Sequence, residues 1–300
     1  MEYSLLLFIG MGIISTNKHW LIGHSIKIST AIFSGIAMLT FLFEWTEVFS
    51  SIQGCYRILC GCGIFLGLFL LVIIGHIIYL SVVKERIIYT DGAGHTIKVC
   101  FGDLLNLGKC SKDKTVNSIV IPVNRCFDCT VDDKLIASST LHGKALSKLY
   151  MENAFSPDSL NSEIQRCLSC CEYTELTSAQ KPSGNLKRYP AGTVVTIDSG
   201  KQRFFLFGLS SFNKDLKAST SKDDYTVAVQ KLYEFCDSNA QGGQVFMPII
   251  GTGLSRVIKD KNSALRYLVN MAILNDDLLS FDLIFVIPES ERNNISITNI

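Results

Sequence analysis

The hydrophobic positions of this chain are concentrated in its first third, and the longest continuous apolar stretch runs from Ile58 to Val83. No formally charged residue interrupts it between Arg57 and Lys84. At about 1.5 Å per residue, a helix of this length exceeds the roughly 30 Å hydrocarbon core of a bilayer. Only a helix satisfies its own backbone polar groups in that environment. The pattern therefore predicts a transmembrane helix over residues 58–83.

A second, weaker apolar segment ends at Phe43 and reaches spanning length when its start is placed near residue 21, with Lys27 toward the membrane surface. We interpret residues 1–86 as a membrane region in which two transmembrane helices, over about residues 21–43 and 58–83, form a hairpin. Lysine and arginine flank the outer ends of the two helices more than the link between them. This distribution places both ends of the hairpin in the cytosol.

The apolar residues from Tyr3 to Ile14 are too few for a third crossing. We expect an interfacial or re-entrant segment there. No basic region precedes it, so we do not expect a cleaved signal peptide.

Beyond the hairpin, short apolar runs alternate with helical patterns, which is typical of an α/β fold. We expect a tether over residues 87–94 and one cytosolic domain over residues 95–300, with a mixed sheet sandwiched by helices. Strands are expected at 95–101, 118–123, 193–197, 203–209, 244–250 and 279–287. Helices are expected at 139–151, 159–171, 225–238, and from 255 or 262 to 274. Ligands of such sheets bind beyond the carboxyl ends of the strands.

Net charge and cysteine content limit the classes of ligand that we expect. The net charge of +1 gives no electrostatic footprint for nucleic acid, so we expect no nucleic-acid partner. Of the 11 cysteines, Cys126 and Cys129 form one C-x-x-C pair and Cys167 and Cys170 form another, which is the ligand spacing of structural zinc sites. In a reducing cytosol the favoured alternative is that these cysteines are buried or have no specific role, and we expect no metal.

Three predicted strands end in residues suited to binding a nucleotide. One ends at Gly102 and Asp103, the next at Asn124, and a late one at Gly251, Thr252 and Gly253. Glycines after a strand let backbone N–H groups approach phosphate oxygens. A lone G-x-G, however, is more often only a tight turn. The order of these motifs over about residues 95–288 resembles the macro domain, a module that binds ADP-ribose.

The macro-domain resemblance assigns roles to individual residues. It implies that Asp103, followed by Leu104, accepts a hydrogen bond from the adenine amino group. It implies that Asn124 begins the loop near the distal ribose. It also implies that the loop from Gly251 to Leu254 binds phosphate.

The chain departs from the common macro domain after Asn124, where Arg125, Phe127 and Asp128 replace a glycine-rich loop and a Leu-His-Gly sequence follows at 141–143. Behind a membrane hairpin, this departure resembles the membrane-anchored macro-domain effectors of bacterial Thoeris antiphage systems. In that family a partner TIR-domain enzyme makes an ADP-ribose-derived signal. The resemblance implies a multi-pass protein of the bacterial inner membrane.

The same residues have plainer alternatives. Ser138, Ser139 and Thr140 can cap a helix whose free N–H groups hold a phosphate. His142 is either a ligand contact or a first-turn surface histidine, and Arg125 is either an anion contact or a solvated side chain. The acidic group of Asp128, Asp132 and Asp133 is either a solvated turn or a receptor for the amine of a signal carrying an amino acid.

Two functions follow. The first is a signal-gated effector that binds an ADP-ribose derivative, associates into homo-oligomers through spans carrying Gly63 and Gly67, and disrupts the membrane. The alternative is an anchored hydrolase of ADP-ribose conjugates, which is less favoured because the glycine-rich loop is replaced. We expect no catalytic residue and no cofactor. The candidate ligand-binding residues are Asp103, Leu104, Asn124, Arg125, Phe127, Ser139, Leu141, His142, Gly143, Gly251, Thr252, Gly253 and Leu254.

Overall fold

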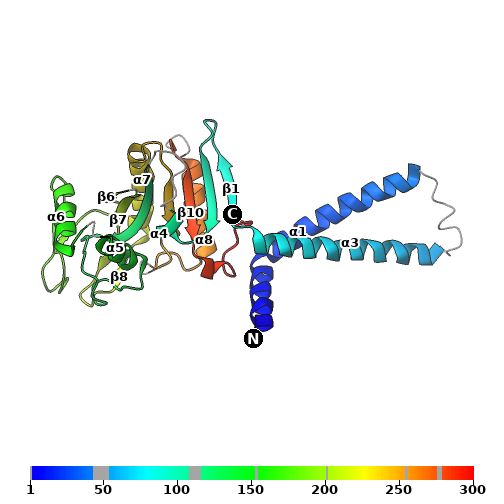
Figure 1. Cartoon of the computed structure of the whole chain (residues 1–300), viewed down its shortest axis with the longest axis horizontal. Coiled ribbons are helices and arrows are strands. Elements are labelled where there is room, and N and C mark those ends of the chain that lie inside the picture. Colours follow the sequence, from blue (N-terminus) through cyan, green and yellow to red (C-terminus); the bar gives the residue numbers. More distant parts are fainter. Residues whose placement is uncertain are drawn as a thin grey trace. The chain divides into compact units, whose positions relative to one another are not determined.

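The computed structural model describes residues 2–42, 54–107, 116–152, 155–200, 202–253, 256–275 and 279–300. It divides into two compact units, drawn with their elements labelled in Figure 1. The first comprises Met1–Lys84 together with Arg292–Asn299, and the second comprises Glu85–Glu291 together with Ile300. We therefore treat the hairpin and the sheet domain separately.

The hairpin unit contains two long helices, α1 (Glu2–Leu42) and α3 (Gly54–Val82). The windows Gly12–Leu39 and Ile58–Val82 have mean hydropathies of 1.3 and 2.8, and both are long and apolar enough to cross a membrane. The predicted second helix agrees with α3. The first helix begins earlier than predicted, because the separate segment expected near the N-terminus is helical and continuous with the rest of α1.

A stripe of α1 residues spaced four apart lies on one helix face and is buried within the hairpin unit. The stripe comprises Ile13, Asn17, Leu21, Ser25 and Ser29, all buried. Ser25 Oγ lies 2.9 Å from His76 Nδ1 of α3, and the Phe33 and Phe65 rings meet edge to face at 5.6 Å. The hairpin interface therefore mixes small polar contacts with aromatic packing.

The sheet domain is built on an eight-stranded mixed sheet in the order β1-β2-β10-β9-β3-β7-β6, with β8 pairing β7. The inner strands β2, β10, β9, β3 and β7 are parallel neighbours, and the outer pairs are antiparallel. The strands are β1 (Glu85–Thr90), β2 (Thr96–Phe101), β3 (Asn117–Asn124), β6 (Val194–Ser199), β7 (Gln202–Phe212), β8 (Ala218–Ser219), β9 (Val245–Pro248) and β10 (Leu283–Ile287). A separate two-stranded ribbon joins β4 (Thr174–Glu175) and β5 (Lys187–Arg188).

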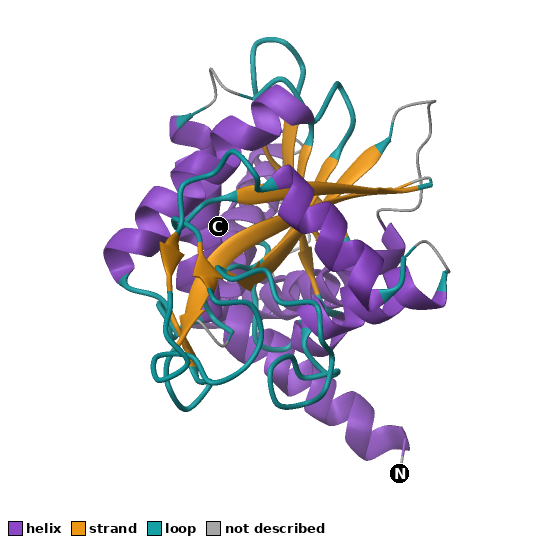
Figure 2. Ribbon diagram, turned by 90° about the vertical axis from the view of Figure 1, so that its left-hand side faces the viewer, coloured by secondary structure: helices purple, strands orange, loops and turns teal. Residues whose placement is uncertain are grey.

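Helices cover both faces of the sheet, as Figure 2 shows. They are α4 (Leu104–Leu107), α5 (Leu141–Met151), α6 (Pro157–Cys167), α7 (Lys222–Asn239) and α8 (Lys261–Leu274). Ile119 and Ile121 of β3 belong to the core cluster that includes α5 and α6. On the other face, Phe205 of β7 packs edge to face on Phe235 of α7 at 5.2 Å. The predicted mixed sheet sandwiched by helices is confirmed.

Two predicted boundaries are corrected. Residues 87–94, expected as a tether, lie in β1 and in the turn to β2, where Asp91 Oδ1 accepts from the Ala93 and His95 N–H groups. The domain therefore begins at Glu85. The C-terminal residues Arg292–Asn299, expected in the cytosolic domain, belong to the hairpin unit because their hydrogen bonds are made with its helices.

Candidate functional site

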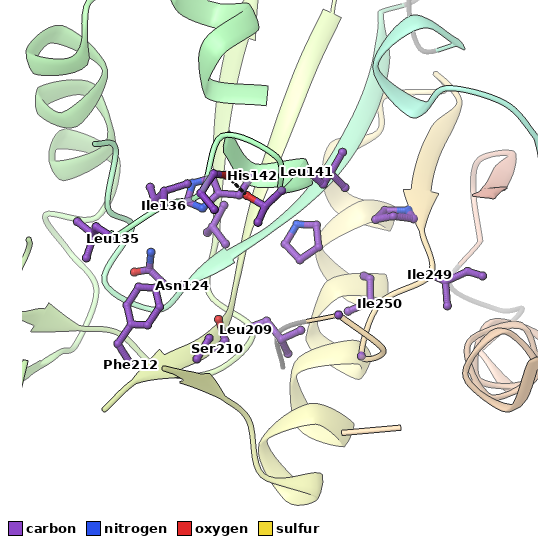
Figure 3. Close-up of a pocket in the computed structure, with 18 residues that line it drawn as sticks. Asn124, Leu135, Ile136, Leu141, His142, Leu209, Ser210, Phe212, Ile249 and Ile250 are labelled. Atoms are coloured by element: carbon purple, nitrogen blue, oxygen red, sulfur yellow. Dashed lines mark hydrogen bonds between the residues drawn. The ribbon is translucent and has the colours of Figure 1, made fainter. Parts of the chain in front are cut away.

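A cavity of about 310 Å³ lies beyond the carboxyl ends of β3 and β9 and beside the end of β7. Figure 3 shows its lining side chains. The wall is formed by Pro122, Val123, Asn124, Leu135, Ile136, Ala137, Thr140, Leu141, His142, Leu209, Ser210, Phe212, Ala218, Pro248, Ile249, Ile250, Gly251 and Gly253. No formally charged side chain is among these described residues. The volume is within the range of small-molecule sites.

Asn124 supplies the best-placed polar group of the cavity. Its side chain is only 4% exposed, and its Oδ1 accepts from the Cys126 N–H at 3.0 Å. Its Nδ2 makes no hydrogen bond of good geometry within the described part of the chain, although the amide acts as a side-chain donor toward the Asp128 carboxylate and lowers the pKa of that group. In Figure 3 the amide lies between Leu135 and Phe212. A buried donor that lacks a well-aligned acceptor is costly, so this nitrogen is suited to a ligand oxygen.

The start of α5 forms a second polar part of the wall. Thr140 is the N-cap, and its Oγ1 accepts from the Gly143 N–H at 3.1 Å. The N–H groups of Leu141 and His142, which line the cavity, have no carbonyl to bond within the helix. A helix N-terminus with free donors favours an anion. Ser139 is exposed and outside the cavity wall.

Gly143 was predicted to contact ligand, but its place is explained by packing. A Cβ at this position would collide with the backbone carbonyl oxygen of Ala137. The glycine therefore lets the first turn of α5 approach the preceding loop. It does not line the cavity.

His142 lies in the cavity wall, and its contact with a ligand remains a prediction. Burial lowers the pKa of His142 to about 3. The imidazole is therefore neutral near neutral pH, and one ring nitrogen donates while the other accepts.

The loop after β9 supplies the third polar part of the wall. Gly251 has a φ of 98°, and a Cβ there would meet the Tyr225 ring, so this position requires glycine. Its carbonyl oxygen accepts from the N–H groups of Val257 and Ile258 at 3.0 and 3.1 Å. Gly253 also lines the cavity, yet a Cβ there would meet nothing within 4 Å.

The two neighbouring loop residues are not part of the described wall. Thr252 does not line the cavity. Leu254 lies outside the described residues.

Asp103 and Leu104 do not line the cavity. Asp103 precedes α4, and its carboxylate accepts from the Leu105 N–H at 3.0 Å and from Asn106 Nδ2 at 2.8 Å. Leu104 is buried in the core at 6% exposure. Asp103 follows β2, and only β10 lies between β2 and β9, the strand that ends at the cavity. The ends of β2 and β9 are therefore about 10 Å apart along the same carboxyl edge. Its contact with adenine remains a prediction.

Arg125 and Phe127 hold the loop after β3 instead of lining the cavity. Arg125 Nε donates to the Tyr189 carbonyl at 2.8 Å, and its Nη1 lies 3.2 Å from Asp224 Oδ2. Phe127 is buried, with a φ of 51°, and its ring meets the Tyr189 ring edge to face at 5.8 Å. Both side chains therefore make structural contacts in this loop, and their contact with a ligand remains a prediction.

The acidic cluster is divided by the fold. Asp128 is buried and paired with the fully buried Lys181, at 3.0 Å between Nζ and Oδ2. Burial raises the pKa of Asp128, and Lys181 opposes that shift. The exposed Asp132 and Asp133 accept backbone N–H bonds in the loop, which lowers the pKa of each. The three carboxylates therefore do not gather into one receptor for an amine.

The two C-x-x-C pairs differ in environment. Cys126 and Cys129 are buried, and burial raises the pKa of each thiol, to about 11 and about 12. Cys167 and Cys170 are exposed. Across the described ranges, no group of three or more His, Cys, Asp or Glu side chains is arranged to hold a metal ion.

Sequence reasoning missed the apolar part of the wall. Leu135, Ile136 and Phe212 come from loops and a strand end far apart in the chain, and no local motif marks them. Ile249 and Ile250 carried a signal, because they stand directly before Gly251 in the motif used to identify the loop.

Residues 97–286 match the family model described as Thoeris protein ThsA, Macro domain. The Thoeris protein ThsA of Bacillus amyloliquefaciens (strain Y2) is 26% identical over 194 residues, covering 64% of this chain and 60% of that protein. The chain thus spans less than two thirds of the length of this relative.

Solved macrodomains of Oceanobacillus iheyensis are also similar. A mutant form aligns with a TM-score of 0.43 at 14% identity, covering 71% of this chain and 93% of that one. The form with ADP aligns with a TM-score of 0.38 at 15% identity, covering 71% and 93%.

Proposed function

We propose that this chain, which belongs to the family of Thoeris ThsA macro domains, is a membrane effector of antiphage defence that is gated by an ADP-ribose-type nucleotide. The observation that carries the proposal is the cavity whose wall combines the first residues of α5 with the glycine loop after β9. Both features favour phosphate oxygens, and they lie at the strand edge where sheets of this class bind nucleotides.

The ligand is expected to extend along this edge. Its adenine end lies toward Asp103, its diphosphate at the start of α5 and at Gly251, and its distal group beside Asn124. The Nδ2 of Asn124 then donates to an acceptor oxygen of the ligand. The distal group also contacts the apolar side chains of Leu135 and Phe212.

We propose binding without turnover. Hydrolysis of an ADP-ribose conjugate needs an activated water, and general-base catalysis is efficient when the base has a pKa near the working pH. His142 is the titratable side chain among the described wall residues, and its pKa of about 3 makes it a poor base near neutral pH.

The hairpin is proposed to anchor the protein in the bacterial inner membrane with the sheet domain in the cytoplasm. Leu80 is the one buried residue among residues 58–82 that the structure describes, as expected of a helix that mostly faces lipid or another copy. Gly63 and Gly67 have nothing near an added Cβ, so this face of α3 is open to another helix. We propose that the signal of a TIR-domain enzyme drives homo-oligomerisation through this face and disrupts the membrane.

Titration calorimetry of the detergent-solubilised full chain with ADP-ribose tests the nucleotide site. We expect binding by the wild type and a ten- to hundredfold weaker affinity for Asp103→Ala, roughly the effect of losing a charge-assisted hydrogen bond. Asp158→Ala is the matched control, because Asp158 lies in the first turn of α6 and outside the cavity wall. Absence of wild-type binding, or equal weakening by both variants, would refute the site.

Carbonate washing of membranes tests the anchor. We expect the full chain to stay in the membrane pellet, since a spanning helix is not released when electrostatic contacts are broken. Release into the supernatant would contradict the membrane part of the proposal.

A further inference from the structure

The last residues of the chain are bonded to the hairpin helices. We call residues Arg292–Asn299, which follow the short helix η2 (Glu289–Glu291), the C-terminal strap. Asn17 of α1 is 4% exposed, and its Oδ1 accepts from Ser296 Oγ at 2.6 Å and from Thr298 Oγ1 at 2.8 Å. Buried polar groups joined in this way fix one arrangement, because separating them leaves unpaired groups.

The strap also caps α3. Arg292 Nη1 donates to the carbonyl oxygens of Leu80, Ser81 and Val83, at 3.4, 3.0 and 3.1 Å. These carbonyls belong to the last turn of the helix and to the residue that follows it, where intrahelical donors run out. A cation at this end also interacts favourably with the helix dipole. One short segment therefore holds the end of α3 and the middle of α1.

The strap is continuous with the short helix η2, which contacts the first residue of α8. Glu291, one residue before Arg292, pairs with Lys261 at 2.6 Å between Oε1 and Nζ. Lys261 is the first residue of α8, and the segment directly before α8 carries Gly251 of the cavity wall.

Both connections to the hairpin leave the same edge of the sheet. Glu85 pairs with Cys100, and Cys100 pairs with Val286, so the start of β1 and the end of β10 are aligned across β2. This is the carboxyl edge of the parallel strands, where the cavity lies.

We propose that the C-terminal strap is the regulatory link between the nucleotide cavity and the hairpin, an inference that rests on the function proposed above. With the cavity empty, Arg292 and Ser296 hold α1 and α3 in the resting arrangement. Ligand at Gly251 shifts the segment before α8, Glu291 moves with Lys261, and the strap leaves the helices. The ligand drives this change to the extent that it binds the undocked state more tightly.

Hydrogen–deuterium exchange of the ligand-free full chain in nanodiscs tests the link. The readout is the strap, where the Thr298 and Asn299 N–H groups donate to Ser296 Oγ. Asn17→Leu should speed this exchange about tenfold or more relative to Ser15→Leu, a neighbouring exposed position of α1.

A second ligand-free comparison tests the route from α8. Lys261→Met should speed strap exchange by up to about fivefold, whereas the exposed Lys259→Met should not. Equal strap exchange in Lys261→Met and Lys259→Met would overturn the link whatever the ligand is.

ADP-ribose is the probe for the liganded arm. In the wild type it should speed strap exchange about threefold or more, and in Lys261→Met it should bind without that effect. Binding with an unchanged wild-type strap overturns the link and leaves the nucleotide site standing. Failure to bind overturns the proposed function, while the ligand-free comparison still decides whether the strap responds to α8.

Discussion

Replacing Lys181 by methionine tests whether the buried ion pair supports the loop that forms the cavity wall. Lys181 Nζ donates to Asp128 Oδ1 at 3.1 Å and to the carbonyl oxygens of Ser183 and Asn185 at 2.6 and 2.9 Å. Both side chains of the pair are at most 1% exposed. Methionine keeps most of the volume but removes the charge and leaves the Asp128 carboxylate buried without its cation.

Loss of one partner of a buried ion pair costs about 3–5 kcal/mol. A domain of roughly this size loses about 2–4 °C of Tm per kcal/mol. We therefore expect Lys181→Met to lower the Tm of the sheet domain by roughly 6–20 °C. Changing Asp128 to asparagine in the same protein should restore part of the loss, because no charge is then left buried and an acceptor remains for the Asn185 N–H.

Thermal unfolding of the detergent-solubilised full chain, followed by near-ultraviolet circular dichroism, measures the effect. Arg166→Met is the matched control, because the Arg166 side chain is 72% exposed and pairs with Glu163 on the surface of α6. It should change the Tm little. A Lys181→Met protein that unfolds within about 2 °C of the wild type would refute the reasoning that this pair is desolvated.

Three further predictions concern the cavity and the spans. Gly251→Ala should lower the Tm, because its φ and the Tyr225 ring exclude a Cβ, whereas Gly253→Val should leave the Tm unchanged and weaken ADP-ribose binding, as calorimetry would measure. The free energy of unfolding should be fully retained above pH 6.5 and fall as the pH drops from there toward 3, since His142 stays neutral when folded and becomes protonated when unfolded. The loss from this group is about 2 kcal/mol at pH 5 and should be absent in His142→Gln in urea titrations. Gly63→Leu with Gly67→Leu should leave ADP-ribose affinity intact but abolish signal-dependent depolarisation; full depolarisation would exclude close packing at this face.

The strands were predictable because buried strands are recognisable in the sequence as apolar runs. β3 is buried on both faces and reads as a nearly continuous apolar run, as expected for an inner parallel strand. β1 was missed because it is short and none of its residues is fully buried. Its sequence therefore resembles that of a linker. The turn at Asp91 joins β1 to β2, and the turn-forming residues there are the ones that led us to expect a tether.

The candidate site was predictable at strand ends and not elsewhere. Asn124 is the last residue of β3 and Gly251 follows the end of β9 closely, so the fold fixes where they lie. The structural contacts of Phe127 and Arg125 could not be predicted because their partner, Tyr189, is more than sixty residues away in sequence. The pairing of Asp128 with Lys181 is equally non-local, and sequence spacing gives no sign of it.

The charge of the cavity wall explains how an anionic ligand is compatible with a chain whose net charge is only +1. The described wall residues include no lysine, arginine or carboxylate, so the attraction for a diphosphate comes from backbone dipoles at Leu141 and His142 and around Gly251. Such dipoles act over the first turn of a helix, and partly buried groups are screened by salt much less than exposed charges. ADP-ribose affinity should therefore change little with ionic strength, in contrast to a site built on surface lysines. A steep loss of affinity between low and high salt would show that cations outside the described wall hold the phosphates.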